Sequence, residues 1–367
     1  MNRGFWKGKN VFLTGHTGFK GGWFSLWLMR CGARVSGYAL PPAHEDGIYI
    51  AARVGSGLHT TAGDIRDAGM LKEAMAAAAP EIVFHLAAQP LVRASYANPT
   101  ETYDVNVMGT VNFLEAVRAT PSVRVAVIIT SDKCYDNREW PWGYRESDPM
   151  GGGDPYSSSK GCVELVTAAY RRSFFTDGRV AVATARAGNV IGGGDWADDR
   201  LVPDMARAWS LRKPLHVRFP GAIRPWQHVL EPLHGYMMLA ERLWGGGQEF
   251  SEGWNFGPRD GDAWPVGNLV ARAAAVWGEG AVWKTDKKDH PHEARFLKLD
   301  CSKARTELGW APLLDLETTL AWTAAWYLAQ HGAATDMGEF TQQQVEQYEG
   351  LLATQSTQFS SLGAAGE

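Results

Sequence analysis

The sequence predicts an α/β fold, a Rossmann-type doubly wound parallel sheet with a smaller C-terminal lobe. Two features of the 367-residue chain carry this prediction. In the segment 11–21, VFLTGHTGFKG, a short apolar run breaks into three glycines spaced three apart before an apolar helical pattern begins. Beyond it, apolar strand-like runs alternate with helical patterns at intervals suited to right-handed βαβ units.

Near-continuous apolar runs separated by helices are typical of a parallel sheet that helices cover on both faces. We expect the strands at Asn10–Thr14, Arg34–Ala39, Ile82–Leu86, Val123–Thr130 and Val180–Arg186. We expect helices between them at Gly22–Cys31, Asp67–Ala79, Thr100–Ala119 and Ser157–Phe175. Ligands of such sheets bind beyond the carboxyl ends of the strands, so motifs that follow the strands are expected to share one crevice.

The texture of the sequence changes after about Asn189, where glycine triplets, prolines and tryptophans break the alternation. We therefore expect a Rossmann domain over 1–188, to which segments near 222–250 return, and a mostly substrate-binding lobe over 189–352. Ser, Gln, Gly and Ala dominate 353–367, which predicts a mobile tail.

Composition excludes several classes of function. The 36 Lys and Arg and 40 Asp and Glu leave a net charge of only −4, and both signs are mixed along the chain. This argues against a nucleic-acid or membrane-binding face and favours a small polar or anionic substrate. Four cysteines without C-x-x-C spacing predict reduced thiols, and apolar runs fall short of the roughly 20 residues of a membrane span. We expect a soluble cytoplasmic protein.

The glycines of the first motif, Gly15, Gly18 and Gly21, suit a phosphate cradle. Glycine permits a tight strand-to-helix turn and close backbone approach, and the helix N-terminus offers free N–H groups to a pyrophosphate. A tight turn without a ligand is the alternative for such a pattern in isolation. A P-loop is excluded because Lys20 is followed by glycine.

Three further features favour a dinucleotide. Gly63-Asp64-Ile65 stands where a carboxylate can accept a hydrogen bond from an adenine amino group, although Asp64 is equally suited to cap the next helix. Leu86-Ala87-Ala88-Gln89 offers small residues beside a cofactor. Tyr38-Ala39-Leu40 ends the second strand without an acidic residue for the ribose, and without a nearby Arg or Lys for a 2′-phosphate. NAD is therefore favoured over NADP.

The reactive groups lie in two segments, Thr130-Ser131-Asp132-Lys133 after the central strand and Tyr156-Ser157-Ser158-Ser159-Lys160 at the start of a helix. Tyr156 and Lys160 are four residues apart and share one helix face. A tyrosine is a poor base near neutral pH, and we expect the lysine ammonium and a positive nicotinamide ring to lower its pKa. Such a pair suits an enzyme that removes a hydroxyl proton during hydride transfer.

The chain resembles the extended short-chain dehydrogenase/reductase family. It carries, in the family's order, the glycine loop, the Ser after the central strand and the Y-x-x-x-K motif. Asp132-Lys133 stands at the acid/base position of the nucleotide-sugar 4,6-dehydratases, where the dTDP-glucose and GDP-mannose enzymes carry Asp-Glu or Glu. The lysine, the segment 189–196 (NVIGGGDW) and the segment 223–233 (IRPWQHVLEPL) are instead similar to the CDP-glucose 4,6-dehydratase subgroup. The resemblance extends from about Phe5 to Leu351.

The resemblance implies an NAD-dependent lyase that turns CDP-D-glucose into CDP-4-dehydro-6-deoxy-D-glucose and water. Tyr156 would be the base for the C4 hydroxyl, assisted by Ser131 and Lys160, while Lys133 would take the C5 proton and Asp132 would protonate the leaving C6 oxygen. The cofactor-binding residues that it implies are Thr14, Gly15, Gly18, Phe19, Lys20, Gly21, Asp64, Ile65, Leu86, Ala87, Ala88, Gln89, Asn106, Thr130, Tyr156 and Lys160. The substrate-binding residues that it implies are Ser131, Asn189, Arg200, Arg218, Arg224, His228 and Glu293.

Alternatives stay open at this point. A nucleotide-sugar 4-epimerase would keep Ser131, Tyr156 and Lys160 without needing Asp132-Lys133, and a dTDP- or GDP-linked dehydratase would differ in nucleotide. A non-enzymatic dinucleotide sensor would typically lose Tyr or Lys. No metal is expected, because a proline separates the histidines of His290-Pro291-His292-Glu293 and they have no partnering Cys/His set. The family implies a homodimer through the helices Thr100–Ala119 and Ser157–Phe175, and a product used for a deoxysugar of a bacterial surface glycan such as the O antigen of lipopolysaccharide.

Overall fold

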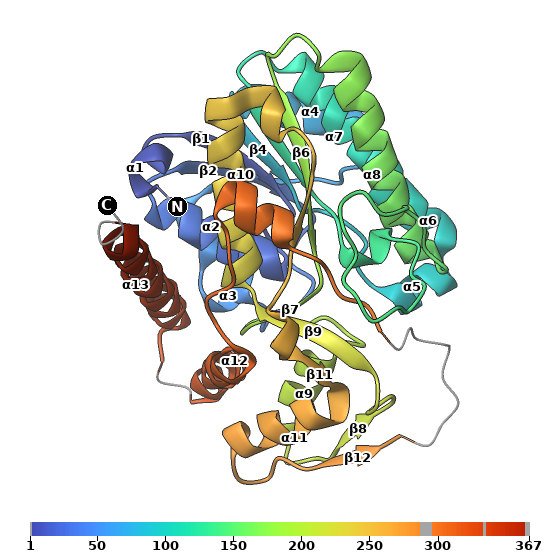
Figure 1. The fold of residues 1–367 in the computed structure, drawn as a ribbon, viewed down its shortest axis with the longest axis vertical. Coiled ribbons are helices and arrows are strands. Elements are labelled where there is room, and N and C mark those ends of the chain that lie inside the picture. The colour runs from blue at the N-terminus through green and yellow to red at the C-terminus, as the bar shows by residue number, and fades with distance from the viewer. Residues whose placement is uncertain (1, 287–295, 333–334, 364–367) are drawn as a thin grey trace.

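The central feature of the computed structural model is a seven-stranded parallel sheet with the strand order β10-β6-β5-β4-β1-β2-β3 (Figure 1). The structure describes residues 2–286, 296–332 and 335–363, with side chains to Gln355. The strands are β1 Asn10–Thr14, β2 Arg34–Ala39, β3 His59–Ala62, β4 Ile82–His85, β5 Val125–Ile129, β6 Ala181–Ala187 and β10 Gly253–Phe256.

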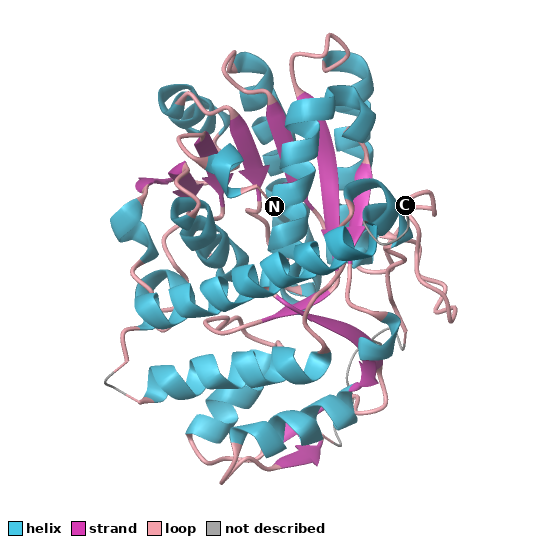
Figure 2. Ribbon diagram, turned by 60° about the vertical axis from the view of Figure 1, so that its left-hand side comes forward, coloured by secondary structure: helices cyan, strands magenta, loops and turns pink. Residues whose placement is uncertain are grey.

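Helices cover both faces of this sheet, as the apolar strands predict (Figures 1 and 2). On one face lie α2 Phe19–Arg30 and α10 Leu230–Gly246, and on the other lie α4 Ala68–Ala78, α7 Gly109–Ala119 and α8 Pro155–Phe174. Successive strand residues point to opposite faces: Val11 and Leu13 join the core under α2, whereas Phe12 joins the core under α4 and α7.

The second lobe lies beyond the carboxyl ends of the strands (Figure 1). It contains a small sheet of β7 Asn189–Ile191, β9 Ile223–His228 and β11 Ala263–Pro265, and a two-stranded sheet of β8 Leu215–Val217 and β12 Trp283–Thr285. Its helices are α9 Leu201–Ser210, α11 Val266–Trp277 and α12 Leu316–His331. The short helices elsewhere are α1 Arg3–Trp6, α3 Ile48–Ala51, α5 Val92–Ala97 and α6 Pro99–Tyr103.

The expected strands β1 and β2 have the bounds read from the sequence, and the other three lie within two residues of them. The helix expected at Thr100–Ala119 is instead α6, a π-helical turn at Asp104–Met108, and α7. The return of the chain to the sheet also differs from the expected 222–250. Strand β9 belongs to the second lobe, and α10 and β10 make the return over 230–256.

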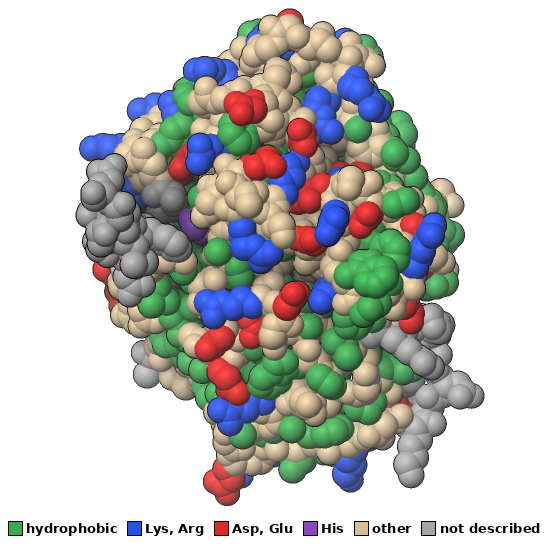
Figure 3. Space-filling view, in the orientation of Figure 1, with side chains coloured by type: hydrophobic (Ala, Val, Ile, Leu, Met, Phe, Trp, Pro, Cys, Tyr) green, Lys and Arg blue, Asp and Glu red, His purple; other side chains and the backbone are tan. Residues whose placement is uncertain are grey.

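The last helix, α13 Met337–Gly363, packs against α2, where Glu349 accepts hydrogen bonds from Trp27 and Arg30. It occupies most of the segment for which we expect a tail, so the backbone of 353–363 is helical. The mobility of that segment stays a prediction. Within the described ranges, none of the helices is both long and apolar enough to span a membrane, and acidic and basic side chains are interspersed on the face in Figure 3.

Candidate active site

A cleft of about 1400 Å³ opens between the carboxyl edge of the main sheet and the second lobe. Its lining brings together the glycine loop, Asp64 and Ile65, Leu86 to Gln89, Thr130 to Lys133, Tyr156, Lys160, Asn189 and three arginines, Arg200, Arg218 and Arg224. Pockets for one drug-sized ligand measure about 300–1,000 Å³, so this cleft has room for two ligands side by side. The motifs expected to share one crevice therefore do so.

The glycine loop closes tightly because its glycines have no side chains. Gly15 has φ +76°, and a Cβ there would lie 2.7 Å from the Ala87 nitrogen. A Cβ at Gly21 would lie 2.1 Å from the Gly15 carbonyl oxygen. Helix α2 begins at Phe19, directly beyond the loop, so its N-terminus faces the cleft and suits a pyrophosphate. Burial and the charges of Arg200 and Lys160 lower the pKa of Lys20 to about 8.

Two expected cofactor residues, Thr14 and Asn106, do not line the cleft. Both are buried and hold the segment that does. The Thr14 hydroxyl accepts hydrogen bonds from the backbone nitrogens of Leu86 and Ala87, at 3.2 Å each. The Asn106 amide accepts from the Gln89 nitrogen at 2.8 Å and donates to the Gln89 oxygen at 3.1 Å. Both residues therefore position the segment that lines the cleft, and their contact with a cofactor stays a prediction.

Asp64 lines the cleft and does not cap helix α4, because Asp67 caps it by accepting a 2.9 Å hydrogen bond from the Met70 nitrogen. The Asp64 carboxylate instead binds Arg66, with 2.6 Å between Oδ2 and Nη2, and this contact lowers the pKa of Asp64. Below it, the buried Tyr38 hydroxyl donates to the Asp64 carbonyl oxygen at 2.9 Å.

The segment after β5 presents an acid and an amine side by side. Ser131 caps a short 3-10 turn, Asp132–Cys134, and its hydroxyl donates to Asp132 Oδ1 at 2.9 Å. Asp132 is buried, and this burial raises the pKa of its carboxyl above the ordinary value although Lys133 opposes the shift. A raised pKa brings a carboxyl group closer to the range in which it can act as a general acid. Lys133 is half-buried and faces the same cleft.

Helix α8 carries Tyr156 and Lys160 into the cleft. Asp154 caps the helix by accepting a 2.9 Å hydrogen bond from the Ser157 nitrogen, and the Tyr156 nitrogen donates to Ser95 Oγ at 3.1 Å. Burial lowers the pKa of Lys160 to about 8. The expectation that Tyr156 has a lowered pKa is not met in the protein alone: burial raises it to about 12, against opposing effects of Ser131 and Arg200. The phenolate therefore needs additional positive charge.

The three arginines come from the second lobe, and two of them are paired with acids that the sequence analysis missed. Arg200 binds Asp195, with 2.9 Å between Nη1 and Oδ2, and Arg218 lies 3.5 Å from Asp199. Asp199 also binds Arg93 of the first lobe at 3.0 Å, so this acid joins the two sides of the cleft. Asp195 directly follows the triplet Gly192–Gly194, a signal that was available in the sequence.

The prediction that His228 lines the substrate pocket is wrong. Its ring is buried and packs edge-on against Trp23 and Trp322, and burial lowers its pKa to about 3. Glu293, together with the histidines at 290 and 292, lies outside the described residues. Among the residues that are described, no cluster of three or more His, Cys, Asp or Glu side chains could hold a metal ion.

Comparison with known proteins agrees with this geometry. The family model described as GDP-mannose 4,6 dehydratase matches residues 12–323. The chain is 54% identical to the CDP-glucose 4,6-dehydratase of Salmonella typhimurium, over 90% of this chain and 93% of that one. It is 25% identical to a dTDP-glucose 4,6-dehydratase of Xanthomonas campestris, over 86% of this chain and 92% of the relative.

Solved structures share the fold. A UDP-glucose 4-epimerase from Stenotrophomonas maltophila, with NAD bound, superimposes with a TM-score of 0.79 at 22% identity, over 89% of this chain and all of the other. A dTDP-glucose 4,6-dehydratase from Streptomyces venezuelae, also with NAD, gives 0.76 at 23% identity, over 89% and 99% of the two chains. From the family match over most of its length and the 54% identical relative, the chain belongs to the nucleotide-sugar 4,6-dehydratase family.

Proposed function

We propose that this protein is a CDP-D-glucose 4,6-dehydratase that uses NAD and converts CDP-D-glucose to CDP-4-dehydro-6-deoxy-D-glucose and water. The observation that carries the proposal is the pair Asp132-Lys133, which lies beside Ser131, Tyr156 and Lys160 in one cleft. The 54% identity to the CDP-glucose 4,6-dehydratase of Salmonella typhimurium supports the choice of reaction and nucleotide.

The residues present fit a dinucleotide. Because Gly15 and Gly21 have no Cβ, the loop packs closely against the start of α2. Backbone N–H groups there can bind a pyrophosphate. Asp64 and Ile65 would hold the adenine end, and Leu86 to Gln89 would flank the cofactor. When bound, NAD would supply the hydride acceptor and donor of the reaction and the positive charge of its oxidised nicotinamide.

The protein's own groups would move three protons. Tyr156 would take the proton of the C4 hydroxyl, with the Lys160 ammonium stabilising the phenolate. The resulting C4 ketone acidifies C5, so that Lys133 can remove the C5 proton. Asp132, which is buried and has a raised pKa, would protonate the C6 oxygen, which leaves as water. As C6 gains hydride, Lys133 would return its proton to C5. Oxidation at C4 and reduction at C6 then balance, so the reaction consumes no external oxidant.

The second lobe would bind the nucleotide diphosphate. Arg200, Arg218 and Arg224 line the cleft on this side together with Asn189. A guanidinium presents paired donors that match phosphate oxygens, which suits all three to an anionic group.

A 4-epimerase needs Ser131, Tyr156 and Lys160 but has no use for a proton donor at C6. The buried Asp132 with its raised pKa therefore favours dehydration over epimerisation. Dehydratases of other nucleotide sugars would perform the same reaction, and the substrate panel below distinguishes them.

The test is to incubate the purified protein, with and without added NAD, with CDP-glucose, dTDP-glucose and GDP-mannose, and to measure loss of one water by mass spectrometry. We expect loss from CDP-glucose alone. Loss from another nucleotide sugar alone would change the assigned substrate, and loss from none after NAD is supplied would contradict the dehydratase assignment.

We further infer a homodimer through α6, α7 and α8. Large apolar side chains are exposed on α8 and on the π-helical turn between α6 and α7: Leu165 at 61%, Met108 at 49% and Phe174 at 47%. A second copy would bury them. Sedimentation equilibrium should give a dimer for the wild type and a monomer for Leu165→Glu, and a monomeric wild type would contradict the inference. The product class suits cytoplasmic synthesis of a deoxysugar for a bacterial surface glycan such as the O antigen of lipopolysaccharide.

A further inference from the structure

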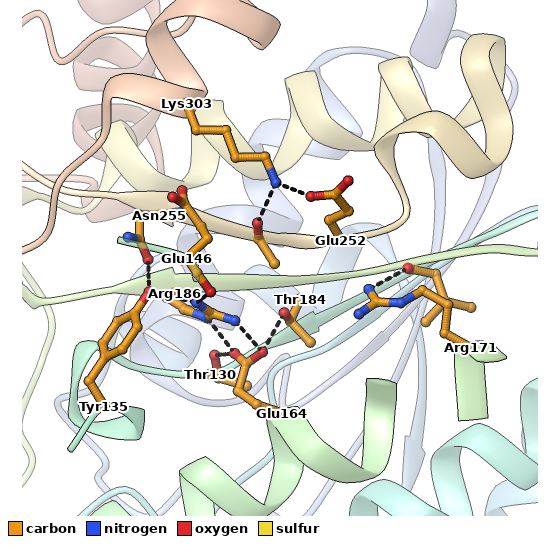
Figure 4. Close-up of polar contacts among 12 residues, drawn as sticks. Thr130, Tyr135, Glu146, Glu164, Arg171, Thr184, Arg186, Glu252, Asn255 and Lys303 are labelled. Atoms are coloured by element: carbon orange, nitrogen blue, oxygen red, sulfur yellow. Dashed lines mark hydrogen bonds and ion pairs between the residues drawn. The ribbon is translucent and has the colours of Figure 1, made fainter. Parts of the chain in front are cut away.

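A buried ion pair, Glu164 with Arg186, lies behind the catalytic segment and has no part in the chemistry described above. Glu164 is on α8 and Arg186 is on β6, and both side chains are only 5% exposed. Figure 4 shows the two side chains facing each other between the helix and the strand.

The pair is saturated with hydrogen bonds. Arg186 donates from Nε to Glu164 Oε1 at 2.9 Å and from Nη2 to Oε2 at 2.8 Å, a two-pronged contact. Thr184 Oγ1 donates to Oε2 at 2.6 Å. The Arg186 guanidinium also packs closely against strand β10, because a Cβ on Gly253 of that strand would lie 2.3 Å from Arg186 Nη2.

The same pair also holds both flanks of the catalytic segment Ser131–Lys133. On the N-terminal side of the segment, Thr130 Oγ1 donates to Glu164 Oε1 at 2.5 Å. On its C-terminal side, Arg186 Nη1 donates to the Tyr135 hydroxyl at 2.5 Å, and this hydroxyl donates to Asn255 Oδ1 at 2.8 Å. Thr130 and Tyr135 therefore attach the segment at both ends to one rigid unit (Figure 4).

We propose that Glu164 and Arg186 are positioning residues, which hold the Ser131–Lys133 segment in register with Tyr156 and Lys160 so that the proton donor and both bases reach one bound sugar. The proposal rests on the proposed function for its catalytic consequence. Glu164 is one helical turn beyond Lys160 on α8, so the unit joins the helix that carries one half of the site to the strand end that carries the other.

Energetics favour positioning over stabilisation as the reason for such a pair. Burying two charges is costly, and replacing a buried ion pair by packed apolar side chains is often neutral or stabilising. Beyond stability, such a pair fixes the relative position of the two elements through its two-pronged contact. This position affects catalysis, because misplacing reacting groups by about 1 Å costs roughly 100-fold in rate.

The pair also affects the charge of Lys160. Burial lowers the pKa of Lys160 to about 8, and the nearby Glu164 carboxylate opposes this shift. Removal of that carboxylate should therefore lower the pH at which Lys160 loses its proton. The pH dependence of kcat/KM therefore provides a second measurement, which would not change if the pair only stabilised the fold.

The experiment compares Glu164→Gln with Thr130→Val and Tyr135→Phe. The first removes the charge, and the other two each remove one attachment while leaving the ion pair intact. Glu231→Gln is the matched control: Glu231 is also fully buried and hydrogen-bonded, to the nitrogens of Leu313 and Leu314 and the Tyr348 hydroxyl, but it touches neither the segment nor α8. Each folded variant is assayed for kcat and KM with CDP-glucose across pH.

Hydrogen exchange of the peptide 129–136 is measured beside activity, because it reports on the segment whatever the substrate proves to be. The amides of Thr130 and Cys134 are hydrogen-bonded in the structure and provide the signal. We expect the three variants to exchange faster there and to lose about 10- to 100-fold in kcat, with KM changed less than about threefold. Glu164→Gln should also move the high-pH limb of kcat/KM to lower pH. Glu231→Gln should match the wild type in the exchange of this peptide, in kcat and in KM.

The outcomes separate the two proposals. Wild-type exchange and kcat in folded Glu164→Gln would overturn the positioning role, as would a rise in KM with unchanged kcat. If Glu164→Gln does not fold, Thr130→Val and Tyr135→Phe decide by the same criteria. If wild-type protein leaves CDP-glucose unchanged, the proposed function fails, while unchanged exchange in all three variants would still overturn the positioning role.

Discussion

Gly21→Ala tests whether the loop between β1 and α2 is built for a dinucleotide. The added Cβ would lie 2.1 Å from the Gly15 carbonyl oxygen and 2.7 Å from His16 Cα. Ordinary contacts are above 3 Å, so the first turn of α2 and the loop must separate by roughly 1 Å. Overpacking of this kind costs about 1–3 kcal/mol. With about 2–4 °C in Tm for each kcal/mol, the expected fall in Tm is about 2–12 °C.

The same displacement moves the N–H groups at the start of α2 away from a bound pyrophosphate. We expect the affinity for NAD, measured by isothermal titration calorimetry, to fall at least about tenfold, which equals about 1.4 kcal/mol. Gly18→Ala is the control for stability, because its Cβ would meet only the Gly15 oxygen at 3.4 Å and its φ is −80°. Wild-type Tm and wild-type NAD affinity in Gly21→Ala would refute the reasoning.

Three further predictions follow from the site and its surroundings. Lys133→Ala should reduce the rate of water loss from CDP-glucose, measured by mass spectrometry, by about 10²–10⁴-fold, as expected for a lost general base. A mild effect would favour an epimerase. The kcat/KM for CDP-glucose should fall as pH rises through about 8, because Lys160 loses its proton there, and a profile flat from pH 7 to 9 would contradict this role. Burial raises the pKa of Glu231 from 4.5 to about 7, so the folded state holds a proton that the unfolded state releases, and wild-type stability falls as pH rises between those values. Glu231→Gln should therefore have a higher Tm than wild type at pH 8 and about the same Tm at pH 4, and a difference independent of pH would rule this out.

Most of the main sheet follows from the sequence because its strands are buried on both faces. The runs that became β1, β2, β4, β5 and β6 are apolar and separated by helical patterns, so their order and approximate bounds could be read directly. Strand β3, His59–Ala62, was missed because it is a short, mostly exposed edge strand of the sequence HTTA. This strand forms because it pairs with β2, and a local sequence pattern does not reveal such a long-range pairing.

The catalytic groups were predictable for a related reason. Ser131, Asp132 and Lys133 follow one strand of a parallel sheet, and Tyr156 and Lys160 begin the next helix, so the topology brings them to one edge. Their electrostatics were not predictable to the same degree. Burial dominates the pKa of Tyr156, and burial depends on how the second lobe closes over the cleft.

Long-range packing accounts for the errors. His228 stands in a motif that resembles a substrate-binding segment, but Trp23 of α2 and Trp322 of α12 enclose its ring. The Glu164–Arg186 pair joins a helix to a strand 22 residues further along the chain, and neither residue falls in a motif that indicates their contact.

The most direct test of the central claim follows the hydrogen at C4 of the sugar. CDP-glucose deuterated at C4 is incubated with the protein in ordinary water, and the product is examined by NMR and mass spectrometry. Transfer within one cleft, with no net oxidation, predicts that the deuterium appears at C6 of the 4-keto-6-deoxy product. Deuterium retained at C4 of an unchanged or epimerised sugar, or lost to solvent, would contradict the account.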